Sequence, residues 1–152
     1  MPHESRCSPR EIQNYLNRVS GPLLDRIDMH IEVPAMAFRE IASERPSEAS
    51  ATIRMRVVGA RMRQHQRFAA KPKISCNARM GSREIRAHCA LDGATMELLK
   101  MAMSEKNLSA RAYDRILKVS RTIADLGGSA RIGSEHVMEA VQMRSLDQQL
   151  WS

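Results

Sequence analysis

The chain has 152 residues, of which 43% are hydrophobic, 27% are charged and 3% are aromatic, and its formal net charge is +7. This composition excludes a disordered or collagen-like protein, and no apolar run approaches the roughly 18 residues that a membrane-spanning helix needs. The three cysteines include no C-x-x-C pair, which argues against a disulfide framework and a four-ligand zinc site, so we predict no metal site and a cytoplasmic location.

The first predicted element is a helix that begins near residue 9. Ser8 is a good N-cap, Pro9 suits the first helical position, and Glu11 can reach back to the Ser8 amide in a capping box. We expect this helix to end near residue 20, because Gly21-Pro22 cannot continue it. Few aromatic residues and eleven Met favour helices over strands in the rest of the core as well.

One strand is predicted after this helix. Met29, Ile31 and Val33 alternate with polar residues, and Pro34 follows them. A single strand cannot satisfy its own backbone hydrogen bonds, so we expect it either to pair with a part of a longer protein or to remain unformed here. The strand is the first indication that the sequence is the tail of a larger protein.

The remaining chain is predicted to be a linker followed by helices. Residues 35–48 mix Pro, Ser and charged residues, which is typical of a linker with one short helical turn. A helix is expected from about 50 to 68, where Ile53, Val57 and Ala60 form a thin apolar stripe. Four more helices are predicted, at 82–89, 93–105, 109–126 and 134–146.

The helix at 109–126 has the clearest pattern. Ser109 is a plausible N-cap, and Gly127-Gly128 is a strong stop signal. The apolar residues between them are spaced by four, three, four and three: Ala112, Ile116, Val119, Ile123 and Leu126. This spacing predicts one buried face.

The positive charge is concentrated in one segment. Nine basic residues and no acidic residue lie between Ala49 and Arg83, whereas the rest of the chain is close to neutral. Such a stripe indicates either a polyanion partner or a solvated helix face, and the sequence does not favour one over the other. The candidate nucleic-acid-binding residues are Arg54, Arg56, Arg61, Arg63, Arg67, Lys71 and Lys73.

Two further arginines are candidates for phosphate contact. Arg26 follows two leucines and lies between Asp25 and Asp28, an arrangement that suits either a planar donor reaching across an interface or a local salt bridge. Arg111 falls in the first turn of its predicted helix, where the helix dipole disfavours a cation unless an anion binds there. Pairing of Arg111 with Asp114 or Glu105 is the alternative.

These two motifs carry a family resemblance. The run Tyr-Leu-Asn-Arg-Val-Ser-Gly-Pro-Leu-Leu-Asp-Arg-Ile-Asp at 15–28 resembles the segment after sensor 1 in the magnesium-chelatase-like AAA+ ATPases of bacteria, the YifB/ComM competence family. Residues 108–117 and 121–126 are similar to the sensor-2 helix of the C-terminal domain of that family. The resemblance extends over almost the whole chain, through residues 144–147.

The resemblance implies roles for both arginines. Arg26 would be an arginine finger that acts in trans on the nucleotide of a neighbouring subunit, and Arg111 would be the sensor-2 arginine. It also implies a hexameric ring that binds ATP and Mg²⁺. Related chelatase subunits and minichromosome-maintenance helicases have Phe where this chain has Ile27.

The chain departs from a complete ATPase in one respect. It contains no G-x-x-x-x-G-K-[ST] loop and no apolar strand ending in an acidic pair, which would supply the phosphate cradle and the Mg²⁺ ligands. We therefore expect that this chain alone is not an enzyme and binds no cofactor tightly, whereas the full-length parent binds ATP and Mg²⁺.

The predicted fold is mainly α-helical. We expect the C-terminal remnant of an α/β ATPase core with the arginine-finger motif at 1–34, a linker at 35–48, and a helical bundle-like AAA+ lid domain with sensor 2 at 49–152. The expected function is that of a C-terminal fragment of an ATP-driven, DNA-remodelling motor for branch migration in competence and recombination. Its partners would be the rest of the subunit, neighbouring subunits and DNA, but no membrane.

Two other interpretations remain open at this point. The first is a stand-alone helical module that binds nucleic acid through the 49–83 stripe. Few aromatic residues are available for base stacking, so such binding would depend on salt and ignore base sequence. The second is a purely structural or inert truncated product.

Overall fold

The computed structural model describes residues 7–16, 18, 23, 26–31, 33–35 and 47–144. Within these ranges the chain is helical and contains no strand. Among the described helices, none is both long enough and apolar enough to cross a membrane. The mainly α-helical fold class is therefore confirmed.

The first helix, α1 (Pro9–Leu16), begins as its sequence predicts. The Ser8 amide donates to Glu11 Oε2 at 2.7 Å and the Glu11 amide donates to Ser8 Oγ at 3.4 Å, which completes the capping box. Hydrogen bonds from the Ser8 amide and the Ser8 hydroxyl to the Glu11 carboxylate lower the pKa of Glu11. The helix ends at Leu16, before the predicted residue 20, and Gly21-Pro22 lies outside the described residues.

The strand predicted at 29–33 is not formed in the described part of this segment, which is one of the two outcomes expected for a strand without a partner in this chain. The side chains expected to face a core are exposed instead, 46% at Met29 and 85% at Val33, whereas His30 between them is only 8% exposed. The His30 amide donates to the Met143 carbonyl at 2.6 Å. Without a partner strand, the backbone is satisfied by the helical domain.

The helical domain contains α4 (Ser50–Arg67), the short 3-10 helix η1 (Asn77–Arg79), α5 (Ser82–His88), α6 (Gly93–Glu105), α7 (Ala110–Leu126) and α8 (Ser134–Gln142). The bounds of α4 to α7 agree with the sequence prediction to within one residue. Helix α8 ends before the predicted residue 146, and residues 145–152 lie outside the described part. Most of the predicted linker, 36–46, lies outside it as well, including its short helical turn.

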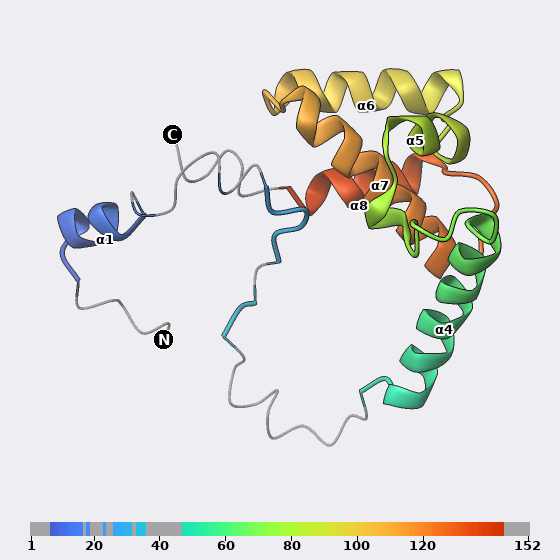
Figure 1. Ribbon diagram of the computed structural model, residues 1–152. Helices are drawn as coiled ribbons and strands as arrows, with labels where there is room; N and C mark the ends of the chain where they lie inside the picture. Colours follow the sequence, from blue (N-terminus) through green and yellow to red (C-terminus); the bar gives the residue numbers. More distant parts are fainter. Residues whose placement is uncertain are drawn as a thin grey trace.

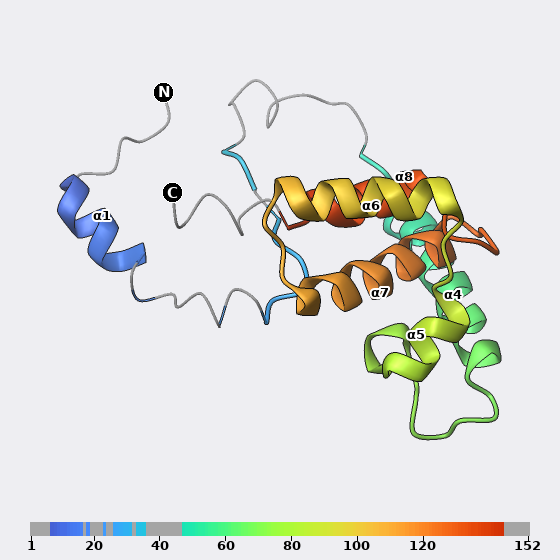
Figure 2. The same ribbon diagram turned by 90° about the horizontal axis from the view of Figure 1, so that it is seen from above.

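Helix α7 is the centre of this domain. It packs against α4, α5, η1 and α8, while α6 packs on α8 (Figure 1). Of the apolar face predicted from its spacing, Ala112 and Ile116 are buried and Val119 and Ile123 are half-buried, whereas Leu126 is 41% exposed. Ile116 meets Leu99 of α6 and Val137 of α8 in one core, to which Ala124 also belongs. Figure 2 shows α6 and α8 on the same side of α7, with α1 apart from the bundle.

Side-chain caps and glycines fix the ends of α7. Ser109 Oγ accepts a hydrogen bond from the Ala112 amide at 3.1 Å. At the other end Gly128 has φ +74°, the left-handed conformation that favours glycine, and the Ser129 amide donates back to Ala124 O at 2.8 Å. These caps define where Arg111 and Asp125 lie at the two ends of the helix.

Candidate functional site

The turn that carries Arg26 lies on the surface. The Arg26 amide donates to the Leu23 carbonyl at 3.0 Å, which closes the turn, and the Arg26 side chain is exposed. Among described residues, its guanidinium makes no ion pair, and Asp28, one candidate for a local salt bridge, pairs with Arg115 instead. The other candidate, Asp25, lies outside the described residues.

Two arginines of the helical domain hold this turn. The Arg115 guanidinium on α7 donates to the Arg26 carbonyl oxygen and to the Asp28 carboxylate. Arg144, just after α8, donates from Nη1 to the Ile27 carbonyl at 2.9 Å. The turn is therefore fixed by contacts from α7 and from the residues just after α8, and Figure 2 shows the blue 26–31 segment passing the start of α7.

Arg111 lies in the first turn of α7 and is exposed, as its position after Ser109 predicts. Arg111 and Arg115 are four residues apart, so they project from the same face of the helix. Arg115 in turn contacts the backbone of Arg26. The structure thereby brings the two segments singled out from the sequence to one end of α7.

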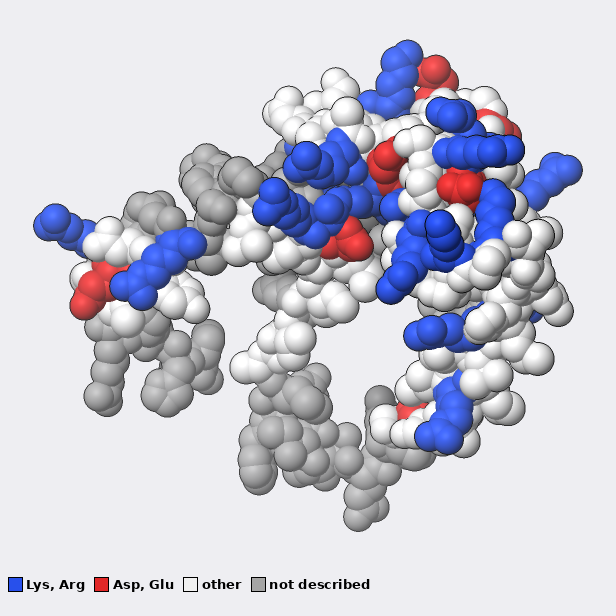
Figure 3. Space-filling view, viewed as in Figure 1, with Lys and Arg blue, Asp and Glu red and all other residues white. Residues whose placement is uncertain are grey.

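The basic stripe divides into two groups in the structure. The exposed candidate residues are Arg54, Arg56, Arg61 and Arg63 on α4, and Lys73 beyond it; Arg56 pairs with Glu48 at 2.8 Å. Figure 3 shows Lys and Arg side chains along α4, with a second group where the 26–31 segment meets the bundle. Among the exposed candidates, Arg54, Arg61 and Lys73 make no ion pair with any described residue.

Three of the candidate basic residues have partners within the helical domain. Lys71 Nζ pairs with Glu84 at 2.7 Å, and this hydrogen bond lowers the pKa of Glu84. Arg63 donates to the Asp125 carbonyl at 3.1 Å. Arg67 donates to both Asp125 carboxylate oxygens, at 2.5 and 2.7 Å. The Arg67 guanidinium is therefore paired inside the domain and contributes to the fold.

Asp125 is the centre of a buried polar network. Its fully buried carboxylate accepts hydrogen bonds from Arg67 and from Asn77 Nδ2 at 2.8 Å, and it lies 3.1 Å from Arg121. Burial raises the pKa of Asp125, but the hydrogen bonds from Arg67 and Asn77 outweigh burial and hold that pKa below its usual range. The network connects α4, η1 and α7.

Sequence reasoning missed the two arginines that hold the Arg26 turn. Arg115 and Arg144 contact residues 87 and 117 positions away, and no local pattern predicts such contacts. The Arg121–Asp125 pair was detectable, because a cation and an anion four residues apart on a predicted helix signal an ion pair.

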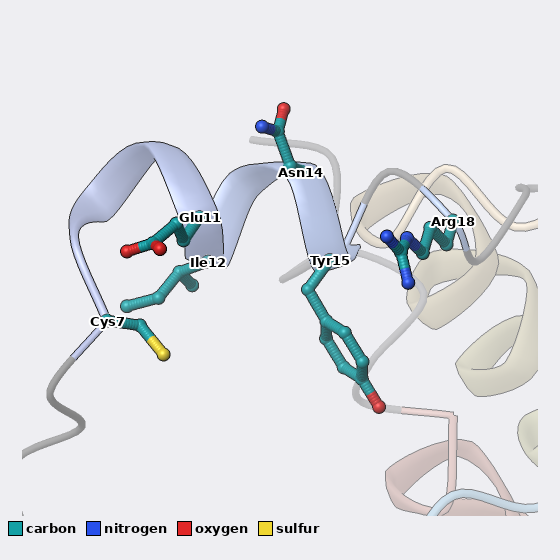
Figure 4. A pocket seen from close by; sticks show the side chains of 6 residues that line it. All are labelled: Cys7, Glu11, Ile12, Asn14, Tyr15 and Arg18. Carbon is teal, nitrogen blue, oxygen red and sulfur yellow. The ribbon is translucent and has the colours of Figure 1, made fainter.

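The cysteines offer no obvious reactive or metal-binding group. Burial raises the pKa of the Cys89 thiol to about 11, so it is protonated near neutral pH. Cys7 is exposed in a shallow pocket along α1, where Figure 4 shows it on the side of Glu11 and Ile12, with Asn14 pointing away. Within the described ranges, no group of three or more His, Cys, Asp and Glu side chains could hold a metal ion.

Comparison with known proteins gives two family matches. Residues 47–144 match the model of the C-terminal region of the magnesium chelatase subunit ChlI, and residues 1–41 match the model of the ChlI subunit itself. Competence protein ComM of Haemophilus influenzae is 43% identical over 143 residues, which is 93% of this chain and 27% of that protein. The uncharacterized protein YifB is 41% identical in Escherichia coli and 39% identical in Salmonella typhimurium, in each case over 97% of this chain. The chain spans 28% of the length of either YifB.

Proposed function

This chain belongs to the magnesium chelatase ChlI family, and from that premise we propose that it is the C-terminal part of a ring-forming AAA+ ATPase. Arg26 is the arginine finger that reaches the nucleotide of the neighbouring subunit. Arg111 is the sensor-2 arginine. The parent would use ATP hydrolysis to remodel DNA, as in branch migration during competence and recombination.

The observation that carries this proposal is the contact between Arg115 and the backbone of Arg26. Through this contact, the exposed Arg26 turn lies against the helix whose first turn carries the exposed Arg111. The exposed Arg111 guanidinium in the first turn of α7 suits an anionic ligand, because both the cation and the helix dipole favour negative charge there, and the exposed Arg26 belongs to a turn held against the same helix. Triphosphate is a ligand of this kind.

The same chemistry limits what the chain does alone. An arginine finger stabilises charge that develops on a transferred phosphoryl group, but the phosphate cradle and the Mg²⁺ ligands are separate parts. Neither part is present in this sequence. ATP and Mg²⁺ would therefore bind mainly to the preceding part of the parent, and this chain would contribute the arginines.

The proposal is tested in a chimaera in which residues 1–152 replace the matching segment of Escherichia coli YifB. We expect the chimaera to hydrolyse ATP and Arg26→Ala to lower turnover on the order of 10³-fold or more, as for other arginine fingers. Arg111→Ala should weaken nucleotide binding as well as turnover, because it contacts phosphate before reaction. Lys100→Ala, at an exposed pair with Glu97 on α6, is the control. Normal turnover in both variants would contradict the proposal.

A second function is supported by the exposed basic side chains on α4. Arg54 and Arg61 are seven residues apart, so they lie on one face, and no acidic residue occurs within α4. This surface suits the phosphate backbone of nucleic acid, with affinity that is independent of base sequence. It is compatible with a motor that contacts DNA and with a stand-alone binding module.

A further inference from the structure

Two successive peptide carbonyls around Arg26 accept hydrogen bonds from guanidinium groups. Arg115 donates to the carbonyl of Arg26, and Arg144 donates to the carbonyl of Ile27 at 2.9 Å. Three residues further on, the His30 amide donates to the Met143 carbonyl at 2.6 Å. The backbone of the turn is therefore fixed at three points, all on α7 or just after α8.

Arg115 also pairs with Asp28, whose carboxylate is the nearest one to Arg26 along the described sequence. Its Nη1 pairs with Asp28 Oδ1, and the Arg115 side chain is only 20% exposed while that of Asp28 is 55% exposed. Asp28 lies two residues after Arg26 and would be a natural partner for the Arg26 guanidinium. The Arg115–Asp28 pair removes Asp28 as a competitor for the Arg26 guanidinium.

Arg144 contributes from inside the domain. It is 1% exposed, and a buried guanidinium is costly unless acceptors surround it. The Ile27 carbonyl is one of those acceptors. The docked turn therefore helps to satisfy a buried charge, so the turn and the C-terminal end of the helical domain stabilise each other.

We propose that Arg115 and Arg144 are positioning residues that fasten the Arg26 turn to the helical domain and keep its guanidinium free of Asp28. The inference rests on the proposed role of Arg26 and adds a rigid connection between Arg26 and the helix that carries Arg111. Because both arginines then move as one body, a displacement of the helical domain carries Arg26 with it. A conformational change of the domain would thereby add or remove both phosphate contacts together.

The first test uses the 152-residue chain and needs no catalysis. Backbone amide hydrogen exchange, measured by NMR, should show strong protection at His30, and Arg115→Ala should reduce this protection. Lys118→Ala is the matched control, because Lys118 is on the same helix but donates to Ala78 instead. An unprotected His30 amide in the wild type, or the same protection in Arg115→Ala as in the wild type, would contradict the proposal that Arg115 holds the turn on the helical domain.

The second test measures steady-state ATP hydrolysis in the YifB chimaera. Loss of the Arg115 contacts should displace the Arg26 guanidinium only by a small distance, so we expect Arg115→Ala to lower kcat on the order of 10- to 100-fold. The KM for ATP should change little, because a finger acts mainly in the transition state. Arg115→Lys keeps a cation opposite Asp28 and should recover part of the loss.

A double variant separates positioning from stability. If Asp28 captures Arg26 when Arg115 is absent, then Arg115→Ala with Asp28→Ala should turn over faster than Arg115→Ala alone. A purely structural role predicts the reverse, since a second truncation removes more contacts. Arg144→Ala is not used alone, because truncating so buried a side chain can unfold the domain.

The outcomes distinguish the two proposals. Loss of turnover in Arg26→Ala with normal kcat in Arg115→Ala would overturn the positioning role while the arginine finger stands. Slower turnover in the double variant than in Arg115→Ala would overturn the capture by Asp28. A wild-type chimaera without turnover, or normal turnover in Arg26→Ala, would contradict the proposed function and the positioning role with it.

Discussion

Arg67 near the end of α4 and Asp125 near the end of α7 form a two-pronged ion pair, with both carboxylate oxygens within 2.7 Å of the guanidinium. Asp125 is fully buried and also accepts from Asn77 of η1. This pair holds the C-terminal end of α4 against the C-terminal end of α7. The exposed basic side chains of α4 therefore depend on it for their position.

Replacing Asp125 with Ala should destabilise the helical domain strongly. The substitution leaves the guanidinium groups of Arg67 and Arg121 without their carboxylate, and breaking a buried pair in this way costs roughly 3–5 kcal/mol. The free energy of unfolding from urea titration measures this loss. Glu97→Ala, which removes an exposed pair with Lys100, is the control and should cost about 0–1 kcal/mol. Equal losses of unfolding free energy in Asp125→Ala and Glu97→Ala would contradict the stabilising role of the buried network.

The same carboxylate should make stability depend on pH. Because the folded-state pKa of Asp125 is below that of the unfolded chain, the unfolded state takes up the proton first as the pH falls. The stabilisation is complete above the unfolded pKa of about 3.9 and is lost as the pH falls through the folded pKa. The urea concentration at the midpoint of unfolding should fall less steeply with decreasing pH in Asp125→Asn than in the wild type. Parallel curves would exclude Asp125 as the cause.

The helices could be predicted from the sequence because their signals are local. The caps at Ser8 and Ser109, and the spacing of apolar residues through α7, each depend on residues within a few positions of one another. The predicted strand is not formed because its alternation of apolar residues requires a partner strand, which the described chain does not provide. Its exposed apolar side chains are the physical consequence.

The candidate site could be predicted only in part, for the same reason. Arg26 and Arg111 were candidates from their positions in the sequence and a resemblance implied their roles, whereas the network that engages Arg67 joins residues 58 positions apart. A count of charges cannot distinguish a solvated arginine from one that is paired with a buried carboxylate. The structure was therefore needed to tell which basic side chains of the stripe are paired with other residues of the chain and which are not.

The exposed part of the stripe gives a prediction for DNA binding. If it contacts phosphates, the 152-residue chain should bind duplex DNA weakly, and log K should fall by about 0.9 per phosphate contact for each tenfold rise in salt. Arg54→Glu with Arg61→Glu should weaken binding without loss of helical circular dichroism, because both side chains are exposed. Lys100→Glu on α6 is the control. Binding that ignores salt, or no binding at low salt, would contradict the second proposed function.

The missing phosphate-binding loop gives a prediction for the chain alone. Two arginines cannot enclose a triphosphate or hold Mg²⁺, so the 152-residue chain should neither bind Mg-ATP tightly nor release phosphate from it. Calorimetric titration and a phosphate-release assay measure both properties. Micromolar affinity with turnover would contradict the interpretation of the chain as one part of an ATPase.

The most direct test of the central claim mixes two inactive forms of the YifB chimaera. One form carries Arg26→Ala, and the other keeps Arg26 but lacks the lysine of the phosphate-binding loop expected in the preceding part. If Arg26 acts on the neighbouring subunit, an intact finger meets an intact loop at some interfaces of the mixed assembly, so the mixture should hydrolyse ATP although neither form does. Inactivity of the mixture, with mixed assemblies verified by native mass spectrometry, would contradict the assignment of Arg26 as an arginine finger in trans.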